Sequence, residues 1–221
     1  MFSIQIWTDE LISRLKAAFG ARLIAVGLQG SFKRGEAHDG SDIDVVVVLD
    51  KLTWHDLTVY KEILAHMPAS SHPACGFISG QEDLKNWSRA ELFQFTYDTD
   101  TLYGSFDGIL SIPARRDALE AAQTGAGTIF HALCHTQVHG KVTSDFLAQL
   151  YKGTCFVLQA LHFAQTGEYV STKQTLLSKL TGLNREILAT LLEGKFPPDS
   201  AEPLLAWCQE TLAYTSAGLR A

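Results

Sequence analysis

Asp42 and Asp44 are the residues whose type and spacing point most directly to chemistry. They stand at the start of a β-branched run at 43–49, the strongest strand signal in the sequence. Side chains alternate along a strand, so two acids separated by one residue lie on the same face. Paired carboxylates repel each other, and a divalent cation removes that repulsion. Because all the donors are oxygens, the pair predicts a site for Mg²⁺ or Mn²⁺.

A second group of candidates lies upstream, just after an apolar run at 22–28 that predicts a buried strand. Gly30 lets the backbone approach a ligand closely, and Ser31 offers a hydroxyl and an amide donor to phosphate oxygens. Lys33 and Arg34 add positive charge, and Gly35 lets the loop turn. A loop that cradles phosphate beside a metal-binding acid pair is what phosphoryl or nucleotidyl transfer requires.

This segment resembles the signature of the DNA polymerase beta-like nucleotidyltransferase superfamily. Gly30-Ser31 is followed, after the ten residues 32–41, by Asp42-Ile43-Asp44 entering a strand. The order of expected elements extends the resemblance over about residues 1–105. The C-terminal half resembles that of kanamycin-type nucleotidyltransferases and of minimal nucleotidyltransferases with a helical, HEPN-like partner domain.

The resemblance implies roles for particular residues. Asp42 and Asp44 would be the catalytic, metal-binding acids, Gly30 and Ser31 would hold the β- and γ-phosphates, and Arg34 would be a secondary phosphate contact. The implied enzyme uses Mg²⁺ or Mn²⁺ to transfer a nucleoside monophosphate from an NTP to an acceptor hydroxyl on a small molecule or a protein, releasing pyrophosphate.

A third carboxylate, which active members of the superfamily generally carry on a later strand, is not evident. The run expected to hold it, at 74–79, contains no acid. Several nearby and distant acids remain candidates: Glu82, Asp83, Asp98, Asp100, Glu120, Asp145 and Glu168. The sequence does not choose among them.

The helices and strands that position these residues are predicted from hydrophobic periodicity and from capping residues, glycines and prolines. In the first half we expect a helix capped at Thr8 and ending at Gly20, strands at 22–28, 43–49, 74–79 and 101–104, and helices at 54–66, 82–87 and 88–95. Beyond Pro113 helical stretches are expected at 114–122, 128–139, 144–165, 172–192 and 201–217. The tryptophans Trp54, Trp87 and Trp207 are expected to pack in the core.

The fold class expected from this order is α+β. Residues 1–112 should form a small mixed-sheet nucleotidyltransferase domain, and residues 113–221 a C-terminal helical bundle. Residues 1–112 hold nine Lys and Arg against fifteen Asp and Glu, which is the entire net charge of −6. A broad basic surface is missing, so duplex nucleic acid is not expected as a partner.

Composition also bounds the setting in which the chain works. No apolar run approaches the 18 residues of a membrane span, and no membrane partner is expected. The four cysteines are scattered without a Cys-x-x-Cys pair, which is typical of free thiols in the cytoplasm. The expected partners are an NTP and an unidentified acceptor, and a homodimer is left open.

Two alternatives to catalysis stay open. One is a nucleotidyltransferase-type antitoxin or regulatory protein that binds or modifies a partner, and the other is a catalytically retired nucleotide-binding module. In the second half, His131, His135 and His139 recur every fourth residue but have no acid beside them, so we expect a helix face rather than a metal site. No histidine follows Arg115 and Arg116 at HEPN ribonuclease spacing, so ribonuclease activity is not expected.

Overall fold

The computed structural model describes residues 2–68 and 71–221 and divides them into two compact units. The first comprises residues 1–88 and 98–112, and the second comprises residues 89–97 and 113–221. The chain therefore crosses from one unit to the other three times. Among the described residues, no helix combines the length and the apolarity that crossing a membrane requires.

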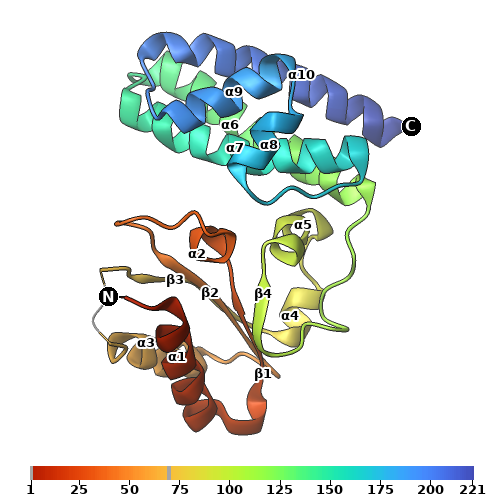
Figure 1. Ribbon diagram of the computed structural model, residues 1–221. Helices are drawn as coiled ribbons and strands as arrows, with labels where there is room; N and C mark the ends of the chain where they lie inside the picture. Colours follow the sequence, from red (N-terminus) through yellow and green to blue (C-terminus); the bar gives the residue numbers. More distant parts are fainter. Residues whose placement is uncertain (1, 69–70) are drawn as a thin grey trace. The chain divides into compact units, whose positions relative to one another are not determined.

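The first unit is built on a four-stranded mixed sheet in the order β3-β2-β1-β4 (Figure 1). Its elements in chain order are α1 (Ile4–Phe19), η1 (Gly20–Arg22), β1 (Leu23–Leu28), α2 (Gly30–Arg34), β2 (Ile43–Leu49), α3 (Trp54–Ala65), β3 (Ala74–Gly80), α4 (Gln81–Lys85) and β4 (Asp100–Gly104). β1 runs antiparallel to both β2 and β4, and β3 runs parallel to β2. The expected mixed sheet is confirmed.

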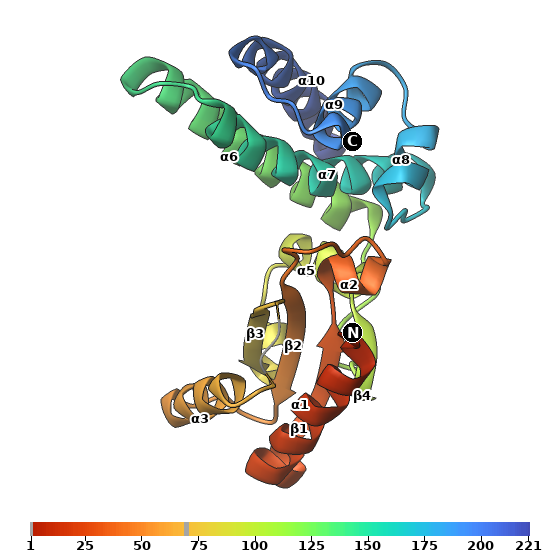
Figure 2. The ribbon, with the colours of Figure 1, turned by 60° about the vertical axis from the view of Figure 1, so that its left-hand side comes forward.

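Alternation along β2 decides which residues reach the core and which reach the site. Ile43, Val45, Val47 and Leu49 pack in one hydrophobic cluster with residues of α1 and α3, which lie against the same face of the sheet (Figure 2). Asp44 alternates with them and so belongs to the opposite face. Packing of Ile43, Val45, Val47 and Leu49 beneath α1 and α3 therefore fixes the face of the sheet to which Asp44 points.

The first helix begins earlier than the sequence suggests. Thr8 is not its cap: α1 begins at Ile4, and Ser3 Oγ accepts a hydrogen bond from the Ile6 amide at 3.5 Å. Thr8 instead donates its hydroxyl back to the carbonyls of Ile4 and Gln5, both at 3.0 Å. A threonine inside a helix makes such bonds, so its residue type alone does not mark a helix start.

The second unit is a helical bundle, as expected. Its elements are α5 (Arg89–Tyr97), α6 (Arg115–His139), α7 (Ser144–Thr166), α8 (Lys173–Lys179), α9 (Gly182–Glu193), η2 (Pro198–Ser200) and α10 (Ala201–Arg220). The stretches expected at 114–122 and 128–139 form the single helix α6, and the stretch expected at 172–192 forms two helices, α8 and α9.

The helix α5 packs on this bundle although the sequence places it among the strands. Phe93 is 1% exposed and forms edge-on ring contacts with Phe163 and Tyr169, with centroids 5.1 Å and 5.9 Å apart. Tyr97 stacks on Tyr169 at 4.6 Å. At the start of α5, Arg89 pairs with the buried Asp117 at 2.8 Å. Aromatic packing and one ion pair thus draw residues 89–97 out of the sheet unit.

The tryptophans do not all pack as expected. Trp207 is 1% exposed, and its indole N–H donates to Asn184 Oδ1 at 2.8 Å. Trp54, at the first position of α3, is 84% exposed, and Trp87 is 46% exposed. The expectation of a core position is wrong for both Trp54 and Trp87. Trp54 is exposed because only one face of α3 contacts the sheet.

The buried Asp56 ties α3 to η1, the turn just before β1. It accepts hydrogen bonds from Arg22 Nη1 and Nη2 at 2.8 Å and 2.9 Å, and from the Thr53 amide and hydroxyl at 2.9 Å and 2.8 Å. The Arg22 hydrogen bonds hold the pKa of Asp56 well below its usual range.

We predict that Asp56→Asn destabilises the first unit by about 2 kcal/mol at pH 7, because it removes the charge of a buried acceptor and weakens its hydrogen bonds from Arg22 and Thr53. The folded-state pKa of Asp56 lies below its unfolded value, so its contribution is complete above about pH 4 and is lost as the pH falls further. Urea unfolding of both proteins at pH 7 and pH 3 measures this. Asp50→Asn is the control, since Asp50 meets the same arginine from an exposed position; an equal loss there contradicts the assignment.

Candidate active site

Three metal-ligating side chains meet where β2 begins. Asp42, Asp44 and Cys75 each offer a ligand atom, and these atoms all lie within 4.8 Å of one another. Asp42 is exposed in the loop before the strand, and Asp44 is half-buried at its second position. Cys75 lies opposite Asp44 on the parallel strand β3. The structure therefore brings the two predicted acids together and adds a thiol that was not predicted.

The Asp44 carboxylate lies close to the negative charges of Asp42 and Asp98. Burial raises its pKa above the ordinary range, the charges of Asp42 and Asp98 raise it further, and the charge of Arg34 lowers it. A cation bound between Asp42 and Asp44 would favour the ionised carboxylate and offset the repulsion. The donor set of two carboxylates and one thiol fits a divalent metal ion, so Asp42 and Asp44 are able to hold the ion that the sequence predicts.

Gly30 brings the backbone against the same carboxylate. Its φ is +67°, and a Cβ atom added there would lie 1.9 Å from Asp44 Oδ2. The preceding amide, of Gln29, donates to the Asp44 carbonyl at 2.8 Å. The turn that leaves β1 is therefore attached to the residue that carries the acid, and no larger side chain fits at position 30.

Ser31 follows in the first turn of the short helix α2, which begins at Gly30. Its side chain is half-buried, and its carbonyl accepts from the Glu36 amide at 2.8 Å, which closes the loop after the helix. Gly35 ends α2 with a φ of +68°. The expected glycine-bearing loop thus contains one helical turn, and Ser31 opens that turn beside Gly30.

The basic residues of α2 are paired with acids. The Arg34 guanidinium contacts the Asp98 carboxylate through Nη1 and Glu36 through Nε at 3.1 Å. Lys33 Nζ lies 3.9 Å from carboxylate oxygens of both Asp98 and Asp100. Burial raises the pKa of Asp98, while the charges of Arg34 and Lys33 oppose that rise. The candidate phosphate contact Arg34 is therefore held in place by Asp98.

This pairing accounts for most of the acids considered as a third carboxylate. Asp98 and Asp100 face the cations of α2, and Gln29 donates to Thr99 Oγ1 between them at 2.7 Å. Asp83 accepts from the Gly80 amide at 3.2 Å as a cap of α4. Other candidates form pairs elsewhere: Glu82 with Lys85, Glu120 with Arg116, and Glu168 with Lys179. Within residues 2–68 and 71–221, no third carboxylate joins the Asp42–Asp44 cluster.

His72 is a positioning residue that sequence analysis missed. Its Nδ1 lies 2.7 Å from the Ser41 carbonyl, and its ring packs edge-on against Phe32 with centroids 5.1 Å apart. Ser41 itself is 5% exposed and bonds twice with the His38 backbone. These contacts fix the residue just before Asp42. A single histidine far along the chain gives no local signal for this role.

The histidine row lies on the exposed surface of α6 in the second unit. The rings of His131 and His135 are 6.0 Å apart, and those of His135 and His139 are 4.9 Å apart. Where the structure describes the chain, they are not part of a cluster of three ligands.

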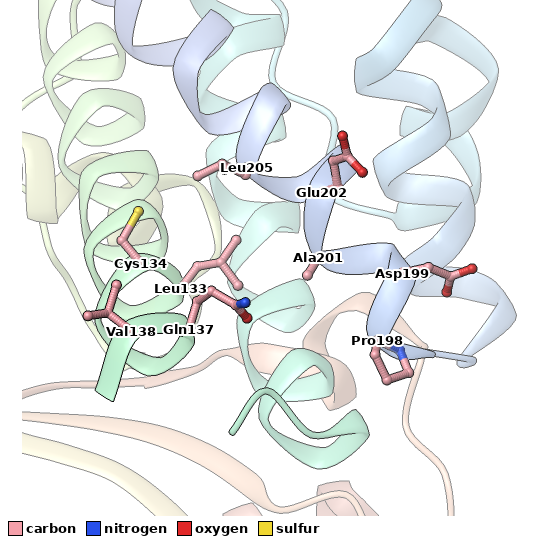
Figure 3. Close-up of a pocket in the computed structure, with 9 residues that line it drawn as sticks. All are labelled: Leu133, Cys134, Gln137, Val138, Pro198, Asp199, Ala201, Glu202 and Leu205. Carbon is pink, nitrogen blue, oxygen red and sulfur yellow. The ribbon is translucent and has the colours of Figure 1, made fainter. Parts of the chain in front are cut away.

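A groove of about 430 Å³ lies elsewhere in the second unit. One wall comes from α6, with Leu133 and Val138, and the other from η2 and α10, with Pro198, Ala201 and Leu205 (Figure 3). It shares no residue with the acidic cluster, and its lining is mainly apolar.

We predict that Gly30→Ala displaces the Asp44 carboxylate, because the added methyl group overlaps Oδ2. The affinity for Mn²⁺, measured by electron paramagnetic resonance, should fall at least about tenfold, and the first unit should lose more than about 1 kcal/mol of stability. Gly35→Ala is the matched control: it has nearly the same φ, but nothing lies within 4 Å of the added Cβ. It should cost stability and leave Mn²⁺ affinity nearly unchanged; equal metal loss in both variants contradicts the steric account.

Comparison with known proteins identifies the motif-bearing part of the chain. Residues 9–87 match the family model of the nucleotidyltransferase domain. No curated protein matches the chain. Two toxin–antitoxin structures, one of them with AMP-PNP, align at 20% and 19% identity over 59% of this chain and 92% of each of theirs; their TM-scores of 0.33 and 0.31 are too low to support an argument.

The solved spectinomycin adenyltransferase AAD(9) from Enterococcus faecialis, with ATP and spectinomycin, is similar over nearly the whole length. It is 12% identical, the alignment covers 96% of this chain and 100% of that chain, and the TM-score is 0.63. At this identity the likeness is one of fold. Residues 9–87 thus match the nucleotidyltransferase domain, and the chain as a whole shares the fold of the solved adenyltransferase, including its helical C-terminal part.

Proposed function

We propose that this chain transfers a nucleoside monophosphate from a metal-bound NTP to a hydroxyl of a small molecule. The observation that carries the proposal is the contact between Gly30 and Asp44, which places the candidate phosphate turn against the Asp42–Asp44 pair. The domain match at 9–87 supports the reaction class. The solved structure of similar fold holds ATP and spectinomycin, which supports an NTP as donor and a small molecule as acceptor.

In the proposed reaction the acceptor oxygen forms a bond to the α-phosphorus of the NTP. The bond from that phosphorus to the bridging oxygen breaks, pyrophosphate leaves with the electron pair of that bond, and the hydroxyl proton passes to solvent water. A bound Mg²⁺ or Mn²⁺ supplies neutralisation of the developing charge. Asp42 and Asp44 hold the ion, Gly30 lets the loop approach the phosphates closely, Ser31 presents its amide and hydroxyl donors to them, and Asp98 fixes Arg34 at the edge of the loop.

The charge of the first unit favours a cationic acceptor. Residues 1–112 carry a net charge of −6, whereas residues 113–221 carry nine residues of each sign. A negative surface attracts polyhydroxylated amines and repels nucleic acid, so the chemical class we propose for the acceptor is a small amine rich in hydroxyl groups.

A second candidate function, nucleotide binding without transfer, is favoured by one specific observation. The described cluster contains the thiol of Cys75 beside the two aspartates, and no third carboxylate. Metal-dependent NTP binding without pyrophosphate release, over a panel of hydroxylated amines, would support this candidate. A partner-binding role instead predicts a stable protein complex that survives substitution of Asp42.

We predict that Asp42→Asn and Asp44→Asn each lower the rate of pyrophosphate release on the order of 100-fold or more, because each removes a ligand of the ion that stabilises the transition state. The measurement uses purified protein, Mg²⁺ or Mn²⁺, each NTP in turn and a panel of polyhydroxylated amines. Binding of the metal–NTP complex, followed by calorimetry, should weaken in parallel.

Asp39→Asn is the matched control, since Asp39 is an exposed acid of the same loop outside the cluster. Its rate should stay within about twofold of the wild type, as for an exposed loop acid. If both cluster variants bind the metal–NTP complex as tightly as the wild type, Asp42 and Asp44 are not the metal ligands and the proposed site is wrong.

A further inference from the structure

Cys75 enters the metal cluster through strand pairing. β3 runs parallel to β2 with the register Asp44↔Cys75, continuing through Val45↔Gly76 and Val46↔Phe77. Residues paired in this way direct their side chains to the same face of the sheet. The thiol is therefore placed on the face that carries Asp44, away from the hydrophobic cluster beneath α1 and α3.

The geometry of the three groups suits a single ion. The Cys75 sulfur and one oxygen from each of Asp42 and Asp44 lie within 4.8 Å of one another. Two donors bound to one ion at about 2.0–2.3 Å are at most about 4.6 Å apart, so modest side-chain adjustment brings all three onto one centre.

The buried Asp98 adds negative charge near this place. Asp98 Oδ1 is buried and has no hydrogen-bond partner, and the Lys33 ammonium stands 3.9 Å from it. The side chain of Asp98 is 7% exposed, and its charge acts on Asp44. Three acids thus share a region whose described cations, Lys33 and Arg34, are bound to one of them. A cation at the cluster offsets the remaining charge.

We propose that the Cys75 thiolate is the third protein ligand of the ion held by Asp42 and Asp44, and that it makes the site prefer a thiophilic divalent cation of the zinc class over Mg²⁺. The proposal rests on the proposed metal-binding role of the two aspartates. Thiolates are soft donors that select Zn²⁺ and related ions, whereas carboxylates and water suit Mg²⁺. Three protein ligands leave a fourth position for water or a phosphate oxygen.

Cys75 can be studied separately from the other cysteines. It is exposed and is the first unit's only cysteine, while Cys134, Cys155 and Cys208 lie in the second unit. A spectroscopic signal from a thiolate–metal bond is therefore assignable by single substitutions in the full chain. Cys134→Ser provides the matched control, because Cys134 is a half-buried thiol outside the cluster.

The test titrates the full-length protein with Co²⁺, a spectroscopic probe for zinc-class sites, and follows the near-ultraviolet thiolate-to-metal charge-transfer band. The wild type and Cys134→Ser should develop the band with one equivalent of Co²⁺, and Zn²⁺ should abolish it by displacement. Cys75→Ser should lack the band and bind Co²⁺ at least about 10- to 100-fold more weakly. Mg²⁺ in hundredfold excess should leave the wild-type band unchanged.

Cys75→Asp is the complementary variant, because it replaces the thiol with a third carboxylate. It should bind Mg²⁺ about tenfold or more tightly than the wild type does and should show no charge-transfer band. A band that persists in Cys75→Ser, or displacement of Co²⁺ from the wild type by equimolar Mg²⁺, overturns the proposal. Circular dichroism of each variant confirms that the fold is retained.

The outcomes separate this inference from the proposed function. If the wild type shows no band, yet Asp42→Asn weakens binding of the metal–NTP complex, the thiol ligand is refuted and the nucleotide site stands. If Asp42→Asn and Asp44→Asn leave both the band and metal–NTP binding unchanged, the acids are not ligands, and both proposals fail together.

Discussion

The arrangement of the site depends on one close approach, between the Gly30 backbone and the Asp44 carboxylate. These residues are fourteen positions apart in the sequence, and antiparallel pairing of β1 with β2 brings the end of one strand to the start of the other, with Leu28 opposite Val45. The Gln29 amide then donates to the Asp44 carbonyl at 2.8 Å, and only glycine fits at position 30. The turn that would bind phosphate and the acid that would bind metal are therefore fixed by the same few backbone contacts.

Charge is balanced unevenly around that contact. Arg34 directs its donors to Asp98 and Glu36, and the Gly30 amide also hydrogen-bonds Asp98. Breaking a buried ion pair costs several kcal/mol, on the order of 3–5 when one partner is removed. Arg34 therefore acts first on the shape of the loop, and its contact with a phosphate requires exchange with Asp98. In the part of the chain that the structure describes, no cation forms an ion pair with Asp42 or Asp44, so a bound ion would offset the repulsion between them.

Local sequence signals predicted the strands and the motif because those features arise from neighbours along the chain. The run at 43–49 is apolar except for Asp44, and β2 has the same bounds. The third ligand was missed because it depends on register: Cys75 is beside Asp44 only once β3 pairs with β2 in parallel. Residues 74–79 contain no acid, but the thiolate of their cysteine can also bind metal.

The predicted helix boundaries in the second half were wrong for a related reason, which is packing between segments that are distant in the sequence. The sequence predicted separate helical stretches at 114–122 and 128–139, yet α6 runs continuously through the glycines between them. A Cβ at Gly125 would lie 2.6 Å from a methyl group of Val157 in α7, so this glycine permits two helices to approach closely. Likewise, no local pattern shows that Phe93 and Tyr97 join the aromatic group around Tyr169 and carry α5 into the helical unit. In both cases packing between distant segments outweighs the local sequence signals.

Metal binding and proton removal are separate requirements in the proposed reaction, and Cys75 bears on both. A thiolate that ligates an ion has committed its electron pair to the metal and is not available as a base. The described acids near the cluster are engaged as well, with Asp98 on Arg34 and Asp83 on the cap of α4. An acceptor amine that is protonated at neutral pH is attracted by the negative charge of residues 1–112, but in that form it does not accept a proton. The acidic composition therefore favours a cationic acceptor, whereas the cysteine, as a metal ligand, does not supply the base that takes the hydroxyl proton.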